Sequence, residues 1–139
     1  MSYRLILLDV QLKPLGSEAE ASKEAYVVLS LRGQRIAGRY VAAPGQDLLA
    51  AIAAATLDAV QQALPVAVEL DLRNAIRLSP QFLDSPLVVV IADLYYGKTH
   101  FELTGACQCE DATVQRGVAQ AALDATNRLV SFIFSEQDE

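Results

Sequence analysis

The sequence predicts an α+β fold in which a unit of three strands and one helix occurs twice, giving six mostly antiparallel strands, two helices and a pseudo-twofold. The first observation is an alignment without a gap: residues 50–64 run in step with residues 116–130, so that Leu57-Asp58-Ala59 matches Leu123-Asp124-Ala125. The second is that both stretches are alanine-rich and place apolar residues at helical spacing. The third is that short strand-like segments precede each of them.

The elements of the first half follow from the positions of apolar runs and turn residues. Asp47 is a plausible helix N-cap, and Pro65 ends the helix because a proline disfavours a helical residue before it. Gly33 with Gln34 makes a tight connection between two strands. The predicted elements are strands over residues 3–12, 25–31 and 35–41, a loop over 14–23, and a helix over about 47–63.

The second half repeats this order. Glu110 and Asp111 are expected to cap the last helix, whose apolar face runs from Val114 to Leu129. The predicted strands cover residues 66–78, 87–95 and 99–106. Residues 132–134, Phe-Ile-Phe, are expected to pack on the sheet or on a partner, and residues 135–139 to form a frayed tail. We therefore predict one domain over residues 1–139, made of two repeats at about 1–65 and 66–134, with the helices covering one side of the sheet surface.

Composition restricts the classes of function. With 139 residues, 53% hydrophobic and 20% charged, the chain is able to form a packed core. The net charge of −6 argues against nucleic acid as a partner, since phosphate binding needs clustered Lys and Arg. No apolar run approaches the ~20 residues of a membrane span, and no signal peptide is visible. We expect a cytoplasmic protein with reduced cysteines.

The order of elements resembles the C-terminal regulatory and dimerisation domain of 2-isopropylmalate synthase, which is built from two such units. Asp111 starts the matching second segment and residues 122–129, Ala-Leu-Asp-Ala-Thr-Asn-Arg-Leu, close it. In the first unit, Gly38 and residues 44–47, Pro-Gly-Gln-Asp, stand where the family has a glycine-rich turn before a helix. The resemblance implies this fold as a stand-alone domain and a homodimer. The leucine site of the family is not carried over, because only Gly38 and Gly45 remain of its turn, with Arg39 and Tyr40 beside Gly38.

Metal chemistry has one candidate set in the sequence. His100 is the only histidine, and Cys107 and Cys109 follow it on a strand that would place both thiols on one face. Three such ligands could hold zinc or copper, but a structural zinc site takes four. A free cysteine also packs as a small apolar group. We therefore expect no metal and no cofactor.

Ligand binding has two further candidates. Backbone amides before the helices, at Gly45, Gln46 and Asp47 and at Glu110 and Asp111, could attract an anion, although the acidic side chains already cap these ends. Asn127 and Arg128 near the end of the last helix could bind a carboxylate, or serve the helix dipole alone. Asp58 and Asp124 occupy equivalent helix positions, where solvated side chains are the simpler interpretation than an acid–base pair.

We interpret the chain as a non-catalytic regulatory or small-molecule-binding module that forms a homodimer or assembles with a partner enzyme. No recognisable nucleophile, phosphate-binding or dinucleotide motif occurs in the sequence. Two alternatives stay open. One is a small enzyme with an active site at a dimer interface around His100, Tyr95 and Asp124. The other is a structural interaction protein without a ligand.

Overall fold

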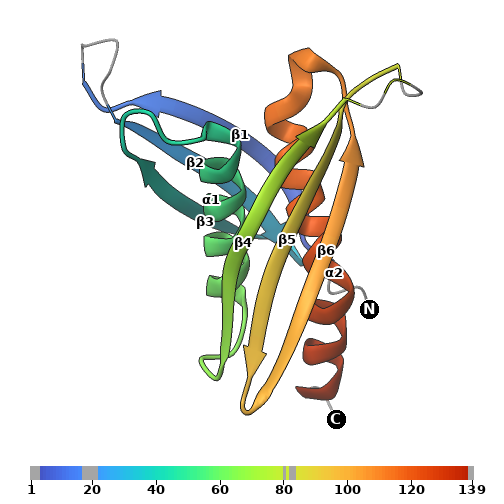
Figure 1. Ribbon diagram of the computed structural model, residues 1–139. Helices are drawn as coiled ribbons and strands as arrows, with labels where there is room; N and C mark the ends of the chain where they lie inside the picture. The colour runs from blue at the N-terminus through green and yellow to red at the C-terminus, as the bar shows by residue number, and fades with distance from the viewer. Residues whose placement is uncertain (1–3, 17–21, 80, 82–83, 138–139) are drawn as a thin grey trace.

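The structure is a computed structural model, and it describes residues 4–16, 22–79, 81 and 84–137. The first unit contains β1 (Ile6–Pro14), β2 (Lys23–Leu31), β3 (Gln34–Ala42) and α1 (Leu48–Ala63). The second contains β4 (Val68–Leu78), β5 (Leu87–Tyr96), β6 (Thr99–Gln108), a single 3-10 turn η1 (Asp111–Thr113) and α2 (Val114–Gln137). The predicted α+β fold of two strand-strand-strand-helix units is confirmed (Figure 1).

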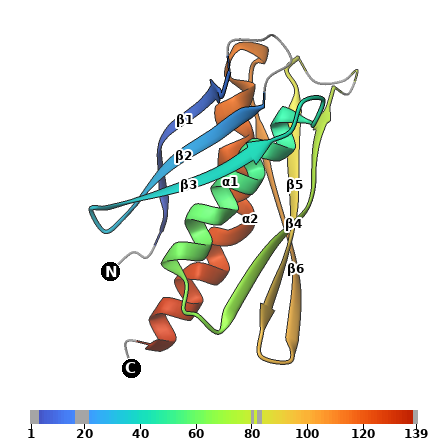
Figure 2. The same cartoon turned by 90° about the vertical axis from the view of Figure 1, so that its left-hand side faces the viewer.

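The strands form two separate antiparallel sheets, in the orders β1-β2-β3 and β4-β5-β6. Each helix covers one face of its own sheet, and the two helices lie side by side between the two sheets (Figures 1 and 2). α1 also contacts β4, and α2 also contacts β1. One continuous cluster of buried apolar side chains consequently joins the two units, so neither unit has a hydrophobic core of its own.

The boundaries differ from the prediction at several ends. β1 begins at Ile6 and continues to Pro14, and β6 continues to Gln108. These ends are set by pairing with the neighbouring strand, which apolar patterning does not report. Residue 3, the predicted start of the first strand, lies outside the described residues. The last helix continues to Gln137, so residues 132–134 and 135–137 are helical rather than a separate tail. Residues 138 and 139 of the predicted frayed tail lie outside the described residues, as does the side chain of Phe134.

A glycine at the centre of each third strand lets the helix backbone approach the sheet. Gly38 and Gly105 are both buried. A Cβ atom on Gly38 would lie 2.8 Å from Ala59 Cβ, and one on Gly105 would lie 2.8 Å from Ala125 Cα. No side chain fits at either position. The small alanine side chains of the two helices therefore allow a close contact between strand and helix in both units.

The residue after each glycine forms the same bond in both units. The Arg39 amide donates to Asp58 Oδ2 at 3.0 Å, and the Ala106 amide donates to Asp124 Oδ2 at 3.0 Å. The two aspartates, which align in the sequence, thus join each helix to the third strand of its sheet. Both bonds are solvent-exposed. Because Asp58 and Asp124 engage different strands of different sheets, they do not form an acid–base pair.

An amide side chain on each helix holds the first strand of the other unit. Gln61 on α1 accepts from the Leu70 amide at 2.6 Å and donates to Val68 O at 2.6 Å. Asn127 on α2 accepts from the Leu5 amide at 2.8 Å and donates to Leu5 O at 3.2 Å. We call these two sets of bonds the cross-unit clamps. They explain how the β1 and β4 ends are fixed on the helix of the opposite unit.

Both sheets contain a bulge at the same place. The register shifts between Leu7 and Asp9 in β1, and between Leu72 and Asn74 in β4. The extra residues, Leu8 and Arg73, have no partner in the ladder of the neighbouring strand. This shared irregularity agrees with a duplicated unit.

Candidate functional site

A groove of about 1060 Å³ lies between β6 and α2, and it combines an apolar wall with charged side chains. Its volume lies slightly above the usual range of about 300–1,000 Å³ for small-molecule sites. β6 is an edge strand, so the groove is open along one side of its sheet. We call it the β6–α2 groove, and its lining is Arg4, Phe101, Glu102, Leu103, Thr104, Ala106, Cys107, Gln120, Leu123, Asp124, Ala125, Asn127, Arg128, Leu129 and Phe132.

The apolar wall comes from side chains that the fold leaves partly uncovered. Phe101 on β6 is 41% exposed and Phe132 on α2 is 58% exposed. Leu103 and Leu129 are half-buried beside them and pack against the core. Phe132, which was expected to pack on the sheet or on a partner, lines the groove. Large exposed aromatic side chains in a concave surface are typical of binding sites.

Two charged residues of opposite sign lie four residues apart on α2 within this groove. Residues at this spacing share one helix face. Asp124 uses one carboxylate oxygen for the Ala106 amide. Arg128 is exposed, and within the described part of the chain its side chain forms neither a hydrogen bond nor an ion pair. The groove thus presents a carboxylate and a guanidinium side by side next to an apolar wall.

The prediction of a ligand at Asn127 and Arg128 stays a prediction, and the two side chains lie in different surroundings. Arg128 lines the groove with its guanidinium available to a ligand. Asn127 also lines it, but both polar atoms of its amide are engaged by Leu5 in the cross-unit clamp. Asn127 is therefore a structural residue at the edge of the groove.

The turns before the two helices do not form part of this groove. Asp47 caps α1 by accepting from the Leu49 amide at 2.9 Å, and Gln46 accepts from the Ala43 amide at 2.7 Å. Gly45 adopts a positive φ of 85° in that turn. The Gln46 amide itself donates to Ala43 O at 3.1 Å, so this donor is already used within the turn, which weakens the turn as an anion site.

At the second helix start, Glu110 is the N-cap of η1 and forms a reciprocal capping box with Thr113. This 3-10 turn precedes α2, so Glu110 and Asp111 do not cap the α-helix directly. Asp111 is paired with Arg77 of β4. Glu110 lines a second, smaller pocket at the end of β6, whereas Asp111 does not.

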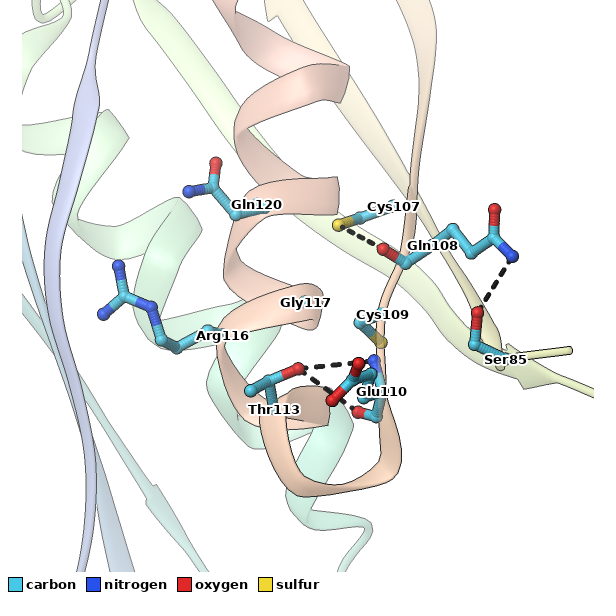
Figure 3. Close-up of a pocket in the computed structure, with 9 residues that line it drawn as sticks. All are labelled: Ser85, Cys107, Gln108, Cys109, Glu110, Thr113, Arg116, Gly117 and Gln120. Carbon is cyan, nitrogen blue, oxygen red and sulfur yellow. Dashed lines mark hydrogen bonds between the residues drawn. The ribbon is translucent and has the colours of Figure 1, made fainter.

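That second pocket has a volume of about 710 Å³ and lies where β6 leads into η1 and α2 (Figure 3). Cys107 and Cys109 both line it, and both are free and half-buried. Burial raises the pKa of the Cys107 thiol, and the neighbouring Cys109 and Asp124 raise it further. Its lining is Ser85, Cys107, Gln108, Cys109, Glu110, Thr113, Arg116, Gly117 and Gln120.

His100 lies in a polar cluster on the opposite face of the second sheet. Its Nε2 lies 2.7 Å from Asp93 Oδ1, and its ring stacks on Tyr95 with centroids 4.7 Å apart. Arg73 donates to both Asp93 oxygens, at 2.9 and 2.7 Å, and to Glu102 at 2.7 Å. The hydrogen bond from His100 is the main cause that lowers the pKa of Asp93, and Arg73 lowers it further although burial opposes both.

Within one chain, the three residues of the alternative interface active site do not all lie together. His100 and Tyr95 are neighbours, but Asp124 is not with them, because it faces the helix side of the sheet and bonds to Ala106. The carboxylate beside His100 is Asp93, which the sequence analysis did not single out. An aspartate inside the apolar run of residues 87–94 was the available indication. Asp93 is 8% exposed and already neutralised by Arg73, so the cluster is an ion-pair network.

Strand alternation also separates His100 from the two cysteines. His100 pairs with Tyr95 and Cys107 pairs with Val88, and these positions face opposite sides of β6. Among the described residues, no three His, Cys, Asp or Glu side chains converge as a metal site. The combination of His100, Cys107 and Cys109 is therefore excluded as one ligand set.

No family model matches the chain, and no curated protein matches it. Within the described part of the chain, no helix has both the length and the apolar character that crossing a bilayer requires.

Proposed function

We propose that this protein is a non-catalytic module that binds a small apolar amino acid, or a zwitterion of similar shape, in the β6–α2 groove. The observation that supports the proposal is the placement of Asp124 and Arg128 on one face of α2 beside Phe101 and Phe132. A regulatory role fits a module of this kind, because a ligand that contacts an edge strand and a helix of one unit stabilises their relative position.

The polar half of the ligand would be recognised by charge. Arg128 offers a planar guanidinium that can bind a carboxylate through two parallel hydrogen bonds. Asp124 keeps one carboxylate oxygen for an ammonium group, since its other oxygen holds the Ala106 amide. Opposite charges four residues apart match the two ends of an α-amino acid better than they match a simple anion.

The apolar half would be recognised by burial. Phe101, Leu103, Leu129 and Phe132 form the wall of the groove, and covering them removes apolar surface from water. Such burial contributes about 25 cal/mol per Å². Leu, Ile, Met or Phe side chains would gain most, whereas glycine and acidic amino acids would gain little.

The proposal predicts a defined effect of Arg128. Calorimetric titration with the twenty amino acids should show binding by at least one apolar member, and Arg128→Gln should weaken that binding by roughly 10-fold or more, equal to about 1.4 kcal/mol. The matched control is Arg116→Gln, since Arg116 is an exposed cation on the same helix outside the groove.

Two results would contradict the proposal: no heat of binding with any amino acid, or equal affinities of Arg128→Gln and the unchanged chain. Analogues of the best ligand that lack either the ammonium group or the carboxylate test whether the protein recognises both charges. His100→Ala should keep the affinity, because His100 lies on the other face of the sheet.

We also propose that the module is a homodimer. On the outer face of the second sheet, Ile76, Val89 and Ile91 are half-buried with no helix over them, next to Leu78, which is 42% exposed. The corresponding face of the first sheet is more polar, with Tyr26 between Lys13 and Arg39. An apolar patch on an open sheet face supports burial by a second copy.

Light scattering after gel filtration tests this second proposal. We expect twice the chain mass of 15.0 kDa at micromolar concentration, and a monomer for Ile91→Lys. Val28→Lys is the control, because Val28 is the equivalent central position of the first sheet and is equally half-buried. A monomeric unchanged chain, or dissociation by Val28→Lys alone, would contradict an interface on the second sheet.

A further inference from the structure

We propose that Cys107 and Cys109 form a two-coordinate site for a soft monovalent metal ion of the Cu(I) type. Cys107 lines both this pocket and the β6–α2 groove, but the metal proposal does not depend on the amino acid proposed for the groove. The sequence alone led us to expect no metal. The structure places both thiols in one pocket, and His100 lies on the other face of β6.

The backbone around the two cysteines is held in an extended form. Cys107 pairs with Val88, the next residue, Gln108, pairs with Leu87, and the Cys109 amide donates to Pro86 O at 3.0 Å. An extended chain separates the Cα atoms of residues i and i+2 by about 6.6 Å. That is at the upper limit of about 6.8 Å for a disulfide, so a direct bond between the sulfurs would be strained.

An ion between the sulfurs removes this strain, because it lengthens the bridge. Both side chains lie at the end of β6 beside α2 (Figure 3). Cys109 packs on Gly117, where a Cβ atom would lie 2.6 Å from the Cys109 sulfur. The absence of a side chain at Gly117 thus leaves the space that the Cys109 thiol occupies.

The number of protein side chains available as ligands indicates which metal ion the site would bind. Zinc takes four ligands in structural sites, and the described residues around the pocket supply no third His, Cys, Asp or Glu in a suitable position. Soft thiolate ligands favour Cu(I), and two thiolates are enough to coordinate this ion. Because both thiols must lose their protons to bind the ion, the affinity should increase with pH.

The test uses Cu(I) itself, added without oxygen to the reduced chain in competition with a chromogenic chelator. We expect one Cu(I) per chain. Cys107→Ser and Cys109→Ser should each weaken binding by roughly 100-fold or more, since one thiolate alone is a poor site. X-ray absorption of the loaded protein should show two sulfur neighbours and no nitrogen.

Two further variants separate a metal site from general damage. Gly117→Ala keeps both thiols but displaces Cys109, so it should weaken Cu(I) binding while circular dichroism stays unchanged. Arg35→Gln is the control, since Arg35 is an exposed cation on β3 outside this pocket, and this variant should bind Cu(I) as the unchanged chain does. The proposal is overturned if either single serine variant retains full affinity, if Cu(I) binds at one ion per two chains, or if Gly117→Ala has no effect on a folded chain.

Discussion

Gly105→Ala should destabilise the fold by about 3 kcal/mol or more, because overpacking at a rigid contact lies at the upper end of its usual range. The added methyl group would lie 2.8 Å from Ala125 Cα, and closer still to the Ala121 carbonyl oxygen. These are backbone atoms of α2, so no side-chain rotation relieves the overlap. The sheet and the helix have to separate. Gly38→Ala should behave in the same way in the first unit.

Denaturant unfolding followed by circular dichroism measures this effect. Gly97→Ala is the control, since Gly97 has a φ of 63° and no neighbour within 4 Å of the added methyl group. Gly97→Ala should lower the free energy of unfolding by only about 1 kcal/mol, which is the cost of an unfavourable backbone conformation. If Gly105→Ala and Gly97→Ala lowered the free energy of unfolding equally, backbone conformation rather than the strand–helix contact would be the reason that position 105 requires glycine.

Asn127→Ala should lower the free energy of unfolding by roughly 2–4 kcal/mol, since it leaves two buried backbone groups unpaired. Both groups belong to Leu5, which is 1% exposed, so water does not readily replace the lost amide. Gln61→Ala should cost a similar amount through Val68 and Leu70, which are also buried. We expect both variants to lower the free energy of unfolding, because each clamp joins one unit to the other.

Gln62→Ala provides the matched control for the clamps. Gln62 follows Gln61 on α1 and also donates to a backbone oxygen, that of Ala37 at 2.7 Å, but this bond is exposed to solvent. Its loss should cost less than about 1 kcal/mol, because water replaces the donor. If Gln62→Ala were as damaging as Gln61→Ala, burial of the clamp would not be the source of its stability.

The sequence was sufficient to predict the repeated unit, because its evidence is local. Helical spacing, Pro65 and the Asp47 cap define α1 within a residue, and the aligned Leu-Asp-Ala triplets identify the two equivalent helices. The physical reason for those triplets was not predictable. Asp58 and Asp124 bond to strand amides, and the alanines face a glycine 16 to 21 residues away in the chain.

The candidate site was less predictable, because it joins residues that are distant in the chain. Arg128 was a sequence candidate, but its neighbours in the groove come from β6 and from Arg4. The amide of Asn127 resembled a ligand group, yet it pairs with Leu5, 122 positions earlier. The predicted anion sites at Gly45 and Glu110 stay predictions. Hydrogen bonds within the turns already use some of their amides, since the Gln46 amide donates to Ala43 O and the Glu110 amide donates to Thr113 Oγ1.

The paired bulges bear on how the two halves of this chain acquired different surfaces. Leu8 and Arg73 stand outside the ladder, so either residue can be exchanged without shifting the pairing of any other. In one half this position holds an exposed aliphatic side chain. In the other it supplies the guanidinium that ties Asp93 to Glu102. After a tandem copying event, such a position would allow new surface chemistry to arise while the inherited backbone stayed intact.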